Sequence, residues 1–109
     1  MPTLSHDRVE MDLFIIQECK SILNHDIDKN CHLVLENYYR DLLDCEFDRP
    51  PDWPYIFQKV YLHACLKGRH EAAIWMQNVL FTAMDPIQQI ALRQIFPYGR
   101  TLLARSLRH

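Results

Sequence analysis

Apolar side chains recur along this chain at the three- and four-residue spacing of helices, with short polar stretches between the repeats. Ser5 or Thr3 can cap the first stretch. Its apolar stripe consists of Val9, Leu13, Ile16 and Leu23, with Ile15, Cys19 and Ile22 beside it. The positions between them are polar: Asp12, Gln17, Glu18 and Ser21. The pattern predicts a helix over about residues 5–24 with one buried face.

A second helix is predicted over about residues 30–45. The polar residues 25–30 form a connection, in which Asp28 or Asn30 can accept the free amides of the next helix. The stripe that follows consists of Cys31, Leu35, Tyr38, Leu42 and Cys45, flanked by Val34, Tyr39 and Leu43.

The clearest break in the chain is Pro50-Pro51, which cannot continue a helix. Asp52 then caps a third helix over about 53–67, with Pro54 in its first turn, where a missing amide costs nothing. Its stripe consists of Trp53, Phe57, Val60 and Ala64. Gly68 is predicted to end it in the left-handed conformation.

A fourth helix is predicted over about 70–84. Its inward residues are expected to be Ala72, Ala73, Met76, Val79, Leu80 and Ala83. Asp85-Pro86-Ile87-Gln88 is a strong start signal for a fifth helix over about 86–96. Its stripe consists of Ile87, Ile90, Ala91 and Ile95. Pro97 is expected to end or kink this helix, and residues 100–107 can form a short terminal one.

These elements predict an all-α fold: one domain over residues 1–109, built as a compact bundle of five to six short helices in antiparallel pairs. Residues 57–86 resemble one tetratricopeptide-type helical hairpin, with Gly68 at the turn, Ala73 and Ile74 opening the second helix, and a closing Asp-Pro. The segment has an extra residue before Pro86 and His70 where the hairpin usually has an aromatic residue. The resemblance implies an antiparallel helix pair for this segment.

Composition narrows the function classes. Apolar residues make up 49% of the 109 residues, which is high for a soluble domain. The surplus favours self-association, although short helices that need a rich core explain it nearly as well. With only two glycines, the chain has no dinucleotide-binding or P-loop fingerprint.

The four cysteines are expected to be reduced. The N-terminus lacks the pattern of a secretory signal, and no apolar run approaches the ~20 residues of a membrane span. A cytoplasmic or nuclear location follows as an expectation. We interpret the thiols as small apolar core residues rather than as a disulfide framework: Cys19, Cys31, Cys45 and Cys65.

No metal, cofactor or catalytic site is predicted. The chain has no C-x-x-C pair, and His63 and Cys65 lie two apart on a helix and so on different faces. The carboxylates around the proline break are expected to be solvated on a polar loop rather than to form an acid–base pair: Asp44, Glu46, Asp48 and Asp52. There is no G-x-S-x-G elbow, so we do not expect an enzyme.

Charge is divided unevenly along the chain. Four arginines and no acidic residue follow Asp85, whereas residues 1–85 carry 8 basic and 14 acidic side chains. The basic set could meet phosphates, or it could dock on the acidic region of its own chain or of a second copy, which we favour. Residues 100–108 are amphipathic but too short for a stable interfacial anchor. The basic set is Arg93, Arg100, Arg105 and Arg108.

The remaining hypothesis is partner binding. Aromatic residues on a proline-stiffened loop lose little entropy on binding, and an outward tryptophan is a typical interface residue. Phe47 and Trp53 could instead pack into the core, and Trp75 could be buried by neighbouring helices. The candidates are Phe47, Trp53, Tyr55, Trp75 and Tyr98. The sequence thus favours a non-enzymatic adaptor or regulatory protein that forms homodimers, with nucleic-acid binding through the arginine-rich end as the alternative.

Overall fold

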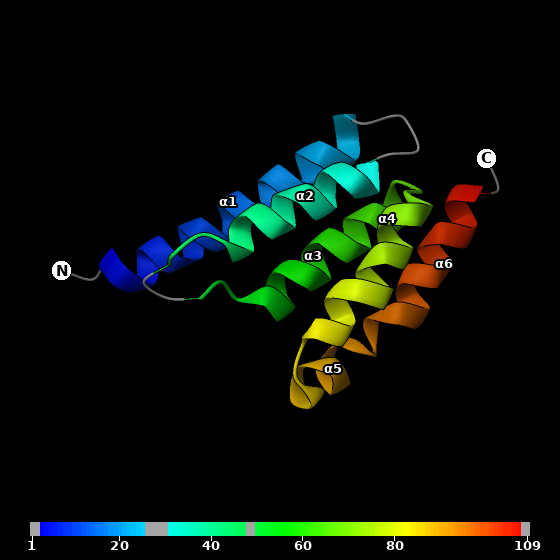
Figure 1. The fold of residues 1–109 in the computed structure, drawn as a ribbon. Coiled ribbons are helices and arrows are strands. Elements are labelled where there is room, and N and C mark those ends of the chain that lie inside the picture. The colour runs from blue at the N-terminus through cyan, green and yellow to red at the C-terminus, as the bar shows by residue number, and fades with distance from the viewer. Residues whose placement is uncertain (1–2, 26–30, 48–49, 108–109) are drawn as a thin grey trace.

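The computed structural model describes residues 3–25, 31–47 and 50–107, with side chains over 10–24, 31–47 and 50–105. Within these ranges the chain is helical and contains no strand, which confirms the all-α bundle (Figure 1). The helices are α1 (Thr3–His25), α2 (Cys31–Leu43), α3 (Trp53–Leu66), α4 (His70–Trp75), α5 (Pro86–Leu92) and α6 (Ile95–Leu107). Between α4 and α5 lie a π-helical turn, η1 (Met76–Leu80), and a 3-10 turn, η2 (Phe81–Ala83).

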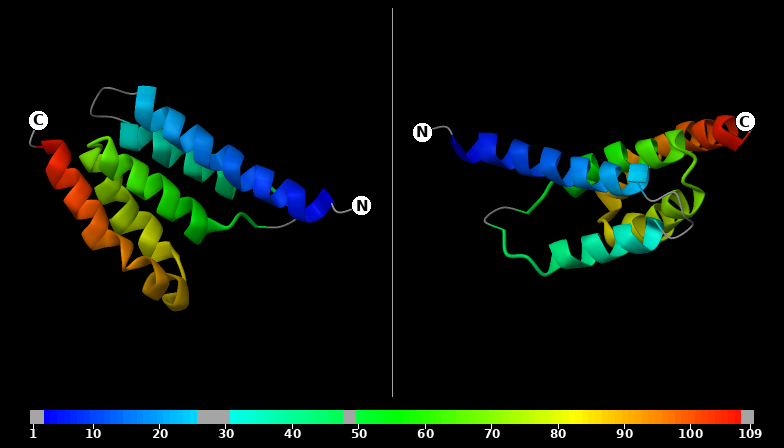
Figure 2. Two further views of the ribbon diagram at one scale, coloured as in Figure 1. Left: turned by 180° about the vertical axis from the view of Figure 1, so that it is seen from behind. Right: turned by 90° about the horizontal axis from the view of Figure 1, so that it is seen from above.

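Helix α3 lies at the centre of the bundle and contacts α1, α4 and α6 (Figures 1 and 2). α1 and α2 run antiparallel, as do α3 and the segment α4–η2, and α6 returns alongside α3. α5 is short and lies at one end of the bundle (Figure 1).

Asp52, Gly68 and Asp85 cap helices as predicted, whereas the predicted caps Asp28 and Asn30 lie outside the described residues, as do the side chains of Thr3 and Ser5. Asp52 precedes α3 and its side chain accepts from the Tyr55 amide, with Pro54 in the first turn. Gly68 follows the helix with φ 72°, and its amide and that of Arg69 donate to Cys65 and Ala64. These local signals act within a few residues of the helix end, so the sequence alone predicts them.

The fourth helix departs from the uniform α-helix predicted over 70–84. After six α-helical residues it widens into η1 and then tightens into η2. The Thr82 hydroxyl donates to the carbonyls of Asn78 (3.1 Å) and Val79 (2.9 Å) at this change. The extra residue in the π turn changes the helical phase, so Val79 and Ala83, expected to face inward, are exposed.

The last two helices also begin and end differently from the prediction. α5 ends at Leu92, and α6 begins at Ile95, so Pro97 lies in the first turn of α6 and neither ends nor kinks a helix. Gly99 is inside α6, where a Cβ atom would lie 2.5 Å from Cε2 of Tyr61. The glycine therefore lets α6 pack closely against α3.

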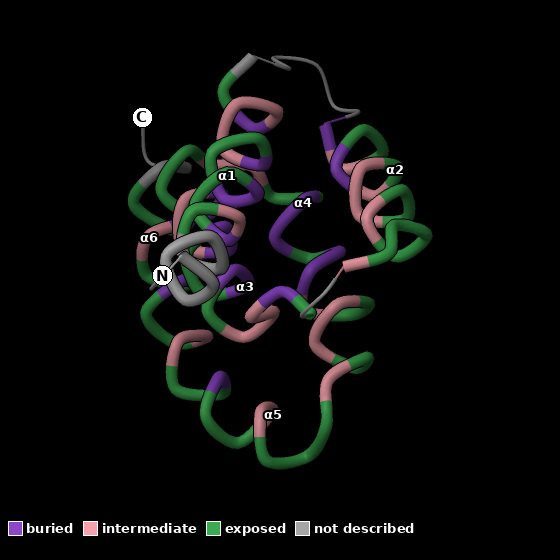
Figure 3. Tube along the Cα trace, turned by 90° about the vertical axis from the view of Figure 1, so that its left-hand side faces the viewer, coloured by how far each residue is buried: buried purple, intermediate pink, exposed green. Residues whose placement is uncertain are grey.

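Core residues come from the first four predicted stripes, but some stripe members are exposed. On α1, Leu13 is exposed and Asp12 is buried, the reverse of the expected pattern. The α5 stripe is wrong as a core prediction, because Ile87 is 81% exposed and Ile90 is 65% exposed. Figure 3 shows much of α5 as exposed. Leu92 supplies the buried contact of α5 instead.

Candidate functional site

Two apolar hollows adjoin each other beside the loop that leads into α3. The inner hollow has a volume of about 90 Å³ and the outer one about 270 Å³. Both are lined by Leu42 and Trp53, so they lie next to each other, and we call the two together the apolar furrow. The inner hollow is lined by Cys19, Leu35, Tyr38, Tyr39, Leu42, Trp53, Ile56, Phe57, Val60, Trp75, Met76, Leu80, Ala83, Met84 and Gln88. The outer one is lined by Leu42, Leu43, Cys45, Phe47, Pro50, Pro51 and Trp53.

Trp53 is held in the furrow by the capping residue before it. The backbone amide of Asp52 donates to Oδ1 of Asp12 on α1 at 3.2 Å, and Oδ1 of Asp52 accepts from the Tyr55 amide at 3.3 Å. Asp12 is only 6% exposed, and this bond to the loop accounts for a buried acid on α1. The loop is therefore tied to two helices where it presents Trp53.

Three aromatic rings form a ladder along the inner hollow. Trp53 packs edge-on against Tyr39 at 5.3 Å between ring centroids, and Tyr39 packs edge-on against Trp75 at 6.0 Å. The ladder joins α3, α2 and α4 and forms a rigid apolar wall.

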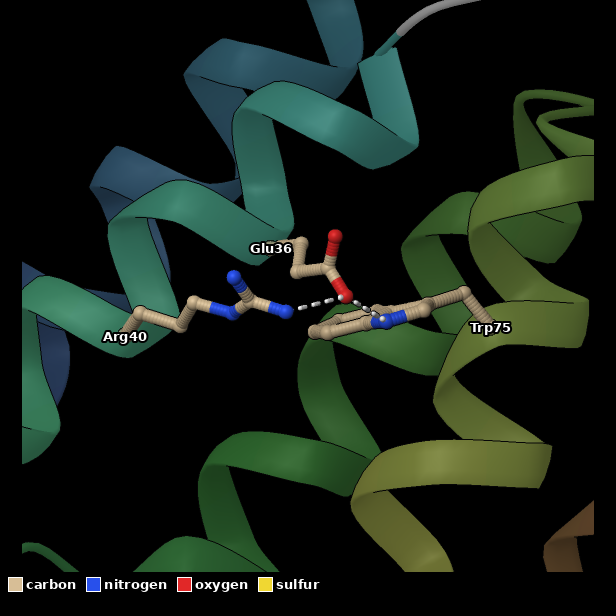
Figure 4. Close-up of polar contacts among 3 residues, drawn as sticks. All are labelled: Glu36, Arg40 and Trp75. Atoms are coloured by element: carbon tan, nitrogen blue, oxygen red, sulfur yellow. Dashed lines mark hydrogen bonds and ion pairs between the residues drawn. The ribbon is translucent and has the colours of Figure 1, made fainter.

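The polar end of Trp75 is satisfied within the fold. Its indole Nε1 donates to Oε1 of Glu36 at 3.2 Å, and the same oxygen lies 3.5 Å from Nη2 of Arg40 (Figure 4). Trp75 is only 9% exposed. Of the two alternatives open for Trp75, outward or buried, the structure has the buried one, with Trp75 lining the inner hollow and bonded to α2.

Two titratable side chains that line the inner hollow, Tyr38 and Cys19, do not ionise near neutral pH. Burial, with smaller contributions from Cys19 and Glu18, raises the pKa of Tyr38 to about 12. Burial and then Glu18 raise the pKa of the Cys19 thiol to about 12. Both groups stay protonated, so neither supplies a thiolate or a base there. The Tyr38 hydroxyl is buried and has no hydrogen-bond partner in the described part of the chain.

Helix α5 borders the furrow and presents its apolar side to solvent. Its start is the predicted capping box: the Gln88 amide donates to Asp85 at 2.9 Å, and Gln88 Oε1 accepts from the Asp85 amide at 3.3 Å. Nε2 of Gln89 donates to the carbonyls of Phe81 and Met84 and thereby ties α5 to η2. Since Gln88 lines the inner hollow, exposed Ile87 and Ile90 lie on a helix that forms the border of the furrow.

Three exposed acidic residues lie close in the chain to the residues that line the outer hollow. Asp41, Asp44 and Glu46 alternate with lining residues along residues 41–47. Of the other two carboxylates considered in the sequence, Asp52 caps α3, and Asp48 lies outside the described residues.

The predicted basic surface is exposed and unpaired. Arg93, Arg100 and Arg105 are exposed, and none forms an ion pair with another described residue. Arg108 lies outside the described residues. Docking of this end on the chain's own acidic region is therefore not seen over the ranges that the structure covers.

No group of three or more potential metal ligands occurs among the described residues. Cys19, Cys31 and Cys65 are buried thiols, as predicted, whereas Cys45 is exposed and lines the outer hollow. None of the described helices is long and apolar enough to cross a membrane.

The furrow unites three of the five predicted partner-binding residues, Phe47, Trp53 and Trp75. The other two do not line it: Tyr55 is exposed with Lys59 5.7 Å from its ring, and Tyr98 is 60% exposed on α6. Sequence reasoning missed that Leu42 lines this surface and that Ile87 is exposed on the helix that borders it. Their only signal was membership of an apolar stripe, which a core and an interface share.

Comparisons of the chain with protein-family models, curated proteins and solved structures gave no match. Function is therefore inferred from the geometry of the apolar furrow and its surroundings.

Proposed function

We propose that this chain is a non-enzymatic protein-interaction module that binds an apolar helical segment in the furrow and self-associates. The observation that carries the proposal is the pair of hollows joined at Leu42 and Trp53. Large aromatic residues in a preformed hollow are typical binding hot spots, since little entropy is lost when a partner covers them. A groove between helices commonly takes the apolar face of another helix.

Three features support a binding role rather than catalysis. Cys19 and Tyr38 in the inner hollow remain protonated at neutral pH, the lining is mainly apolar, and exposed carboxylates are neighbours in the chain of residues that line the outer hollow. Protein interfaces likewise combine an apolar centre with polar residues around it. As part of this proposal the protein acts in the cytoplasm or nucleus, where exposed Cys45 stays reduced.

Site-specific photocrosslinking in the native cell tests the proposal. A photoreactive amino acid at Leu43, which lines the outer hollow and is exposed, should crosslink one defined protein, either another protein or a second copy. The same group at exposed Gln58 on α3 is the control. Absence of a product from position 43, or the same products from both positions, would contradict the proposal.

Nucleic-acid binding is the second candidate, because the described arginines after Asp85 are exposed and unpaired. Arg100 and Arg105 are five residues apart on α6, which separates them by about 140° around the helix axis. They do not form one stripe that could follow a phosphate backbone, so the furrow is favoured. Retention on heparin at low salt that is lost on changing Arg100 and Arg105 to Ala would support this candidate. Elution without retention would exclude it.

A further inference from the structure

We infer that the segment bound in the furrow is α5 of a second copy. In the resulting dimer, each copy places its α5 in the furrow of the other. This inference rests on the proposed interaction function and names its partner. It would place Ile87 and Ile90 of each copy against the furrow of the other.

The first support is the pairing of an unfilled apolar site with an uncovered apolar helix. Ile87 is 81% exposed and Ile90 is 65% exposed, and residues three apart lie on the same side of a helix. The segment Pro86–Leu92 contains no charged residue. α5 therefore presents the kind of neutral aliphatic face that an apolar furrow takes.

The second support is the position of α5 beside the furrow. Gln88, between the two isoleucines in sequence, lines the inner hollow of its own chain. Donor helix and acceptor furrow thus adjoin each other on one side of the molecule. A two-fold axis passing close to Gln88 would allow both insertions at once, and such a self-complementary contact closes as a dimer.

The third support is charge. Exposed Asp41, Asp44 and Glu46 are neighbours in the chain of residues that line the outer hollow, while exposed Arg93 directly follows α5 and no acidic residue follows Asp85. Since Arg93 has no ion pair among the described residues, it is available to a second copy. Opposite charges at the edge of an apolar contact favour the correct orientation.

The volume of the inner hollow also fits an aliphatic side chain. Its 90 Å³ is several times the ~10–15 Å³ that one water molecule needs. The lining offers water few hydrogen-bond partners, whereas a branched aliphatic side chain needs none.

The test is the concentration dependence of molar mass, measured by sedimentation equilibrium from low micromolar to millimolar protein. The wild-type chain should convert from monomer to dimer. Ile87→Asp should raise the dissociation constant at least about tenfold, because it places a charge in the apolar contact. Ile74→Asp, at an exposed isoleucine of α4, is the matched control and should leave the dissociation constant unchanged.

A mixing experiment distinguishes the loss of this reciprocal contact from a general loss of solubility or folding. Leu43→Asp damages the furrow and Ile87→Asp damages the donor helix, and both positions are exposed, so both variants should keep the wild-type circular dichroism spectrum. Each variant alone loses both contacts of its homodimer. An equimolar mixture keeps one intact contact and should associate more tightly than either variant alone.

Several results would overturn the inference: a monomer over the whole range, a dimer equally tight in Ile87→Asp, no complementation on mixing, or a mass that keeps growing beyond two chains. If the chain stays monomeric while position 43 still crosslinks a different protein, the second-copy inference and the self-association in the proposed function fail, and the binding of a partner in the furrow stands. If position 43 also crosslinks nothing, both fail.

Discussion

The contact of α3 with α6 and the furrow bordered by α2 and α5 lie on the same small bundle but are packed in opposite ways. At the first, Tyr61 and Cys65 are fully buried, and Gly99 leaves no room for even one added carbon. At the second, a hollow of about 90 Å³ remains beside two largely exposed isoleucines. Close packing of this kind fixes a fold. An unfilled apolar hollow beside an uncovered helix is instead what a binding surface would present before its partner binds.

The largest expected effect is a loss of folding stability when the contact of α3 with α6 is disrupted. Tyr61 is 0% exposed and stacks on Phe57 at 5.6 Å, with Phe96 edge-on at 5.4 Å. Tyr61→Ala should lower the free energy of unfolding by about 3–5 kcal/mol, as for other large buried aromatic residues. Ile87→Ala at the open end should change it by no more than about 0.5 kcal/mol in the monomer. Urea unfolding of both variants at low concentration makes the comparison, and similar losses would contradict it.

Adding one carbon at the contact of α6 with α3 should also destabilise the folded chain. In Gly99→Ala the new Cβ would lie 2.5 Å from the Tyr61 ring and 2.9 Å from Cys65 Sγ. We expect a net loss of about 1–3 kcal/mol from overpacking, although alanine is ordinarily about 1 kcal/mol better than glycine inside a helix. Thermal unfolding measures the loss. A higher melting temperature than wild type would show that α6 does not pack against α3 this closely.

Trp75 joins α4 to α2, because it is buried on α4 and bonded to Glu36 on α2. Trp75→Phe keeps an aromatic ring but removes the indole donor, so unfolding should cost about 1–2 kcal/mol less than in wild type. Glu36→Gln keeps a side-chain oxygen as acceptor and is the control, with a smaller expected loss. Equal losses in the two variants would mean that the hydrogen bond does not hold α2 in place.

Acidification should weaken the contact between α3 and α1 that His63 makes. Its Nε2 donates to Oδ1 of Asn24 at 2.8 Å, and burial, followed by Lys20 and Lys67, holds its pKa below the ordinary 6.5. The folded state thus binds the proton less readily than the unfolded state, so this contribution is complete above about pH 6.5 and is lost as pH falls through the lower folded pKa. The stability of His63→Gln should therefore fall less between pH 7 and pH 5. An equally steep fall would remove His63 from the account.

Thiol reactivity sharpens the comparison without altering the fold. Burial raises the pKa of Cys19 to about 12 and also raises that of Cys65, whereas Cys45 is exposed in the outer hollow. At pH 8 an aromatic disulfide reagent should modify one thiol per folded chain quickly, and Cys45→Ser should abolish this fast phase. Its rate should fall at high protein concentration, when a second copy covers the furrow. Two or more fast thiols would indicate that the core is open.

The sequence predicted the parts of the fold that depend on neighbouring residues. Asp52 and Asp85 cap helices and Gly68 ends one, since each acts on amides or carbonyls within about one turn. Pro97 was misjudged because proline is harmless in the first turn of a helix, and the start of α6 at Ile95 has no comparable local signal. The role of Gly99 depends on Tyr61, which is 38 positions away in the chain, so no local pattern identifies it.

The candidate site was predictable in composition but not in shape. The sequence singled out Phe47 and Trp53, and the structure places them around one furrow. It misjudged Ile87 and Ile90, because helical periodicity identifies an apolar face but not what covers that face. It left open whether Trp75 is buried, because that depends on Glu36 of α2, which lies 39 positions away in the chain.

The most direct test of the division between a closed core and an open binding end is amide hydrogen–deuterium exchange at low and high protein concentration. Residues 38–47 and 81–92 should exchange more slowly at high concentration, because association covers the furrow and α5. Residues 57–66 and 95–104 should exchange at the same rate at both concentrations, since their contact is complete within one chain. Protection that appears in α3 and α6 instead, or at neither end, would contradict the account.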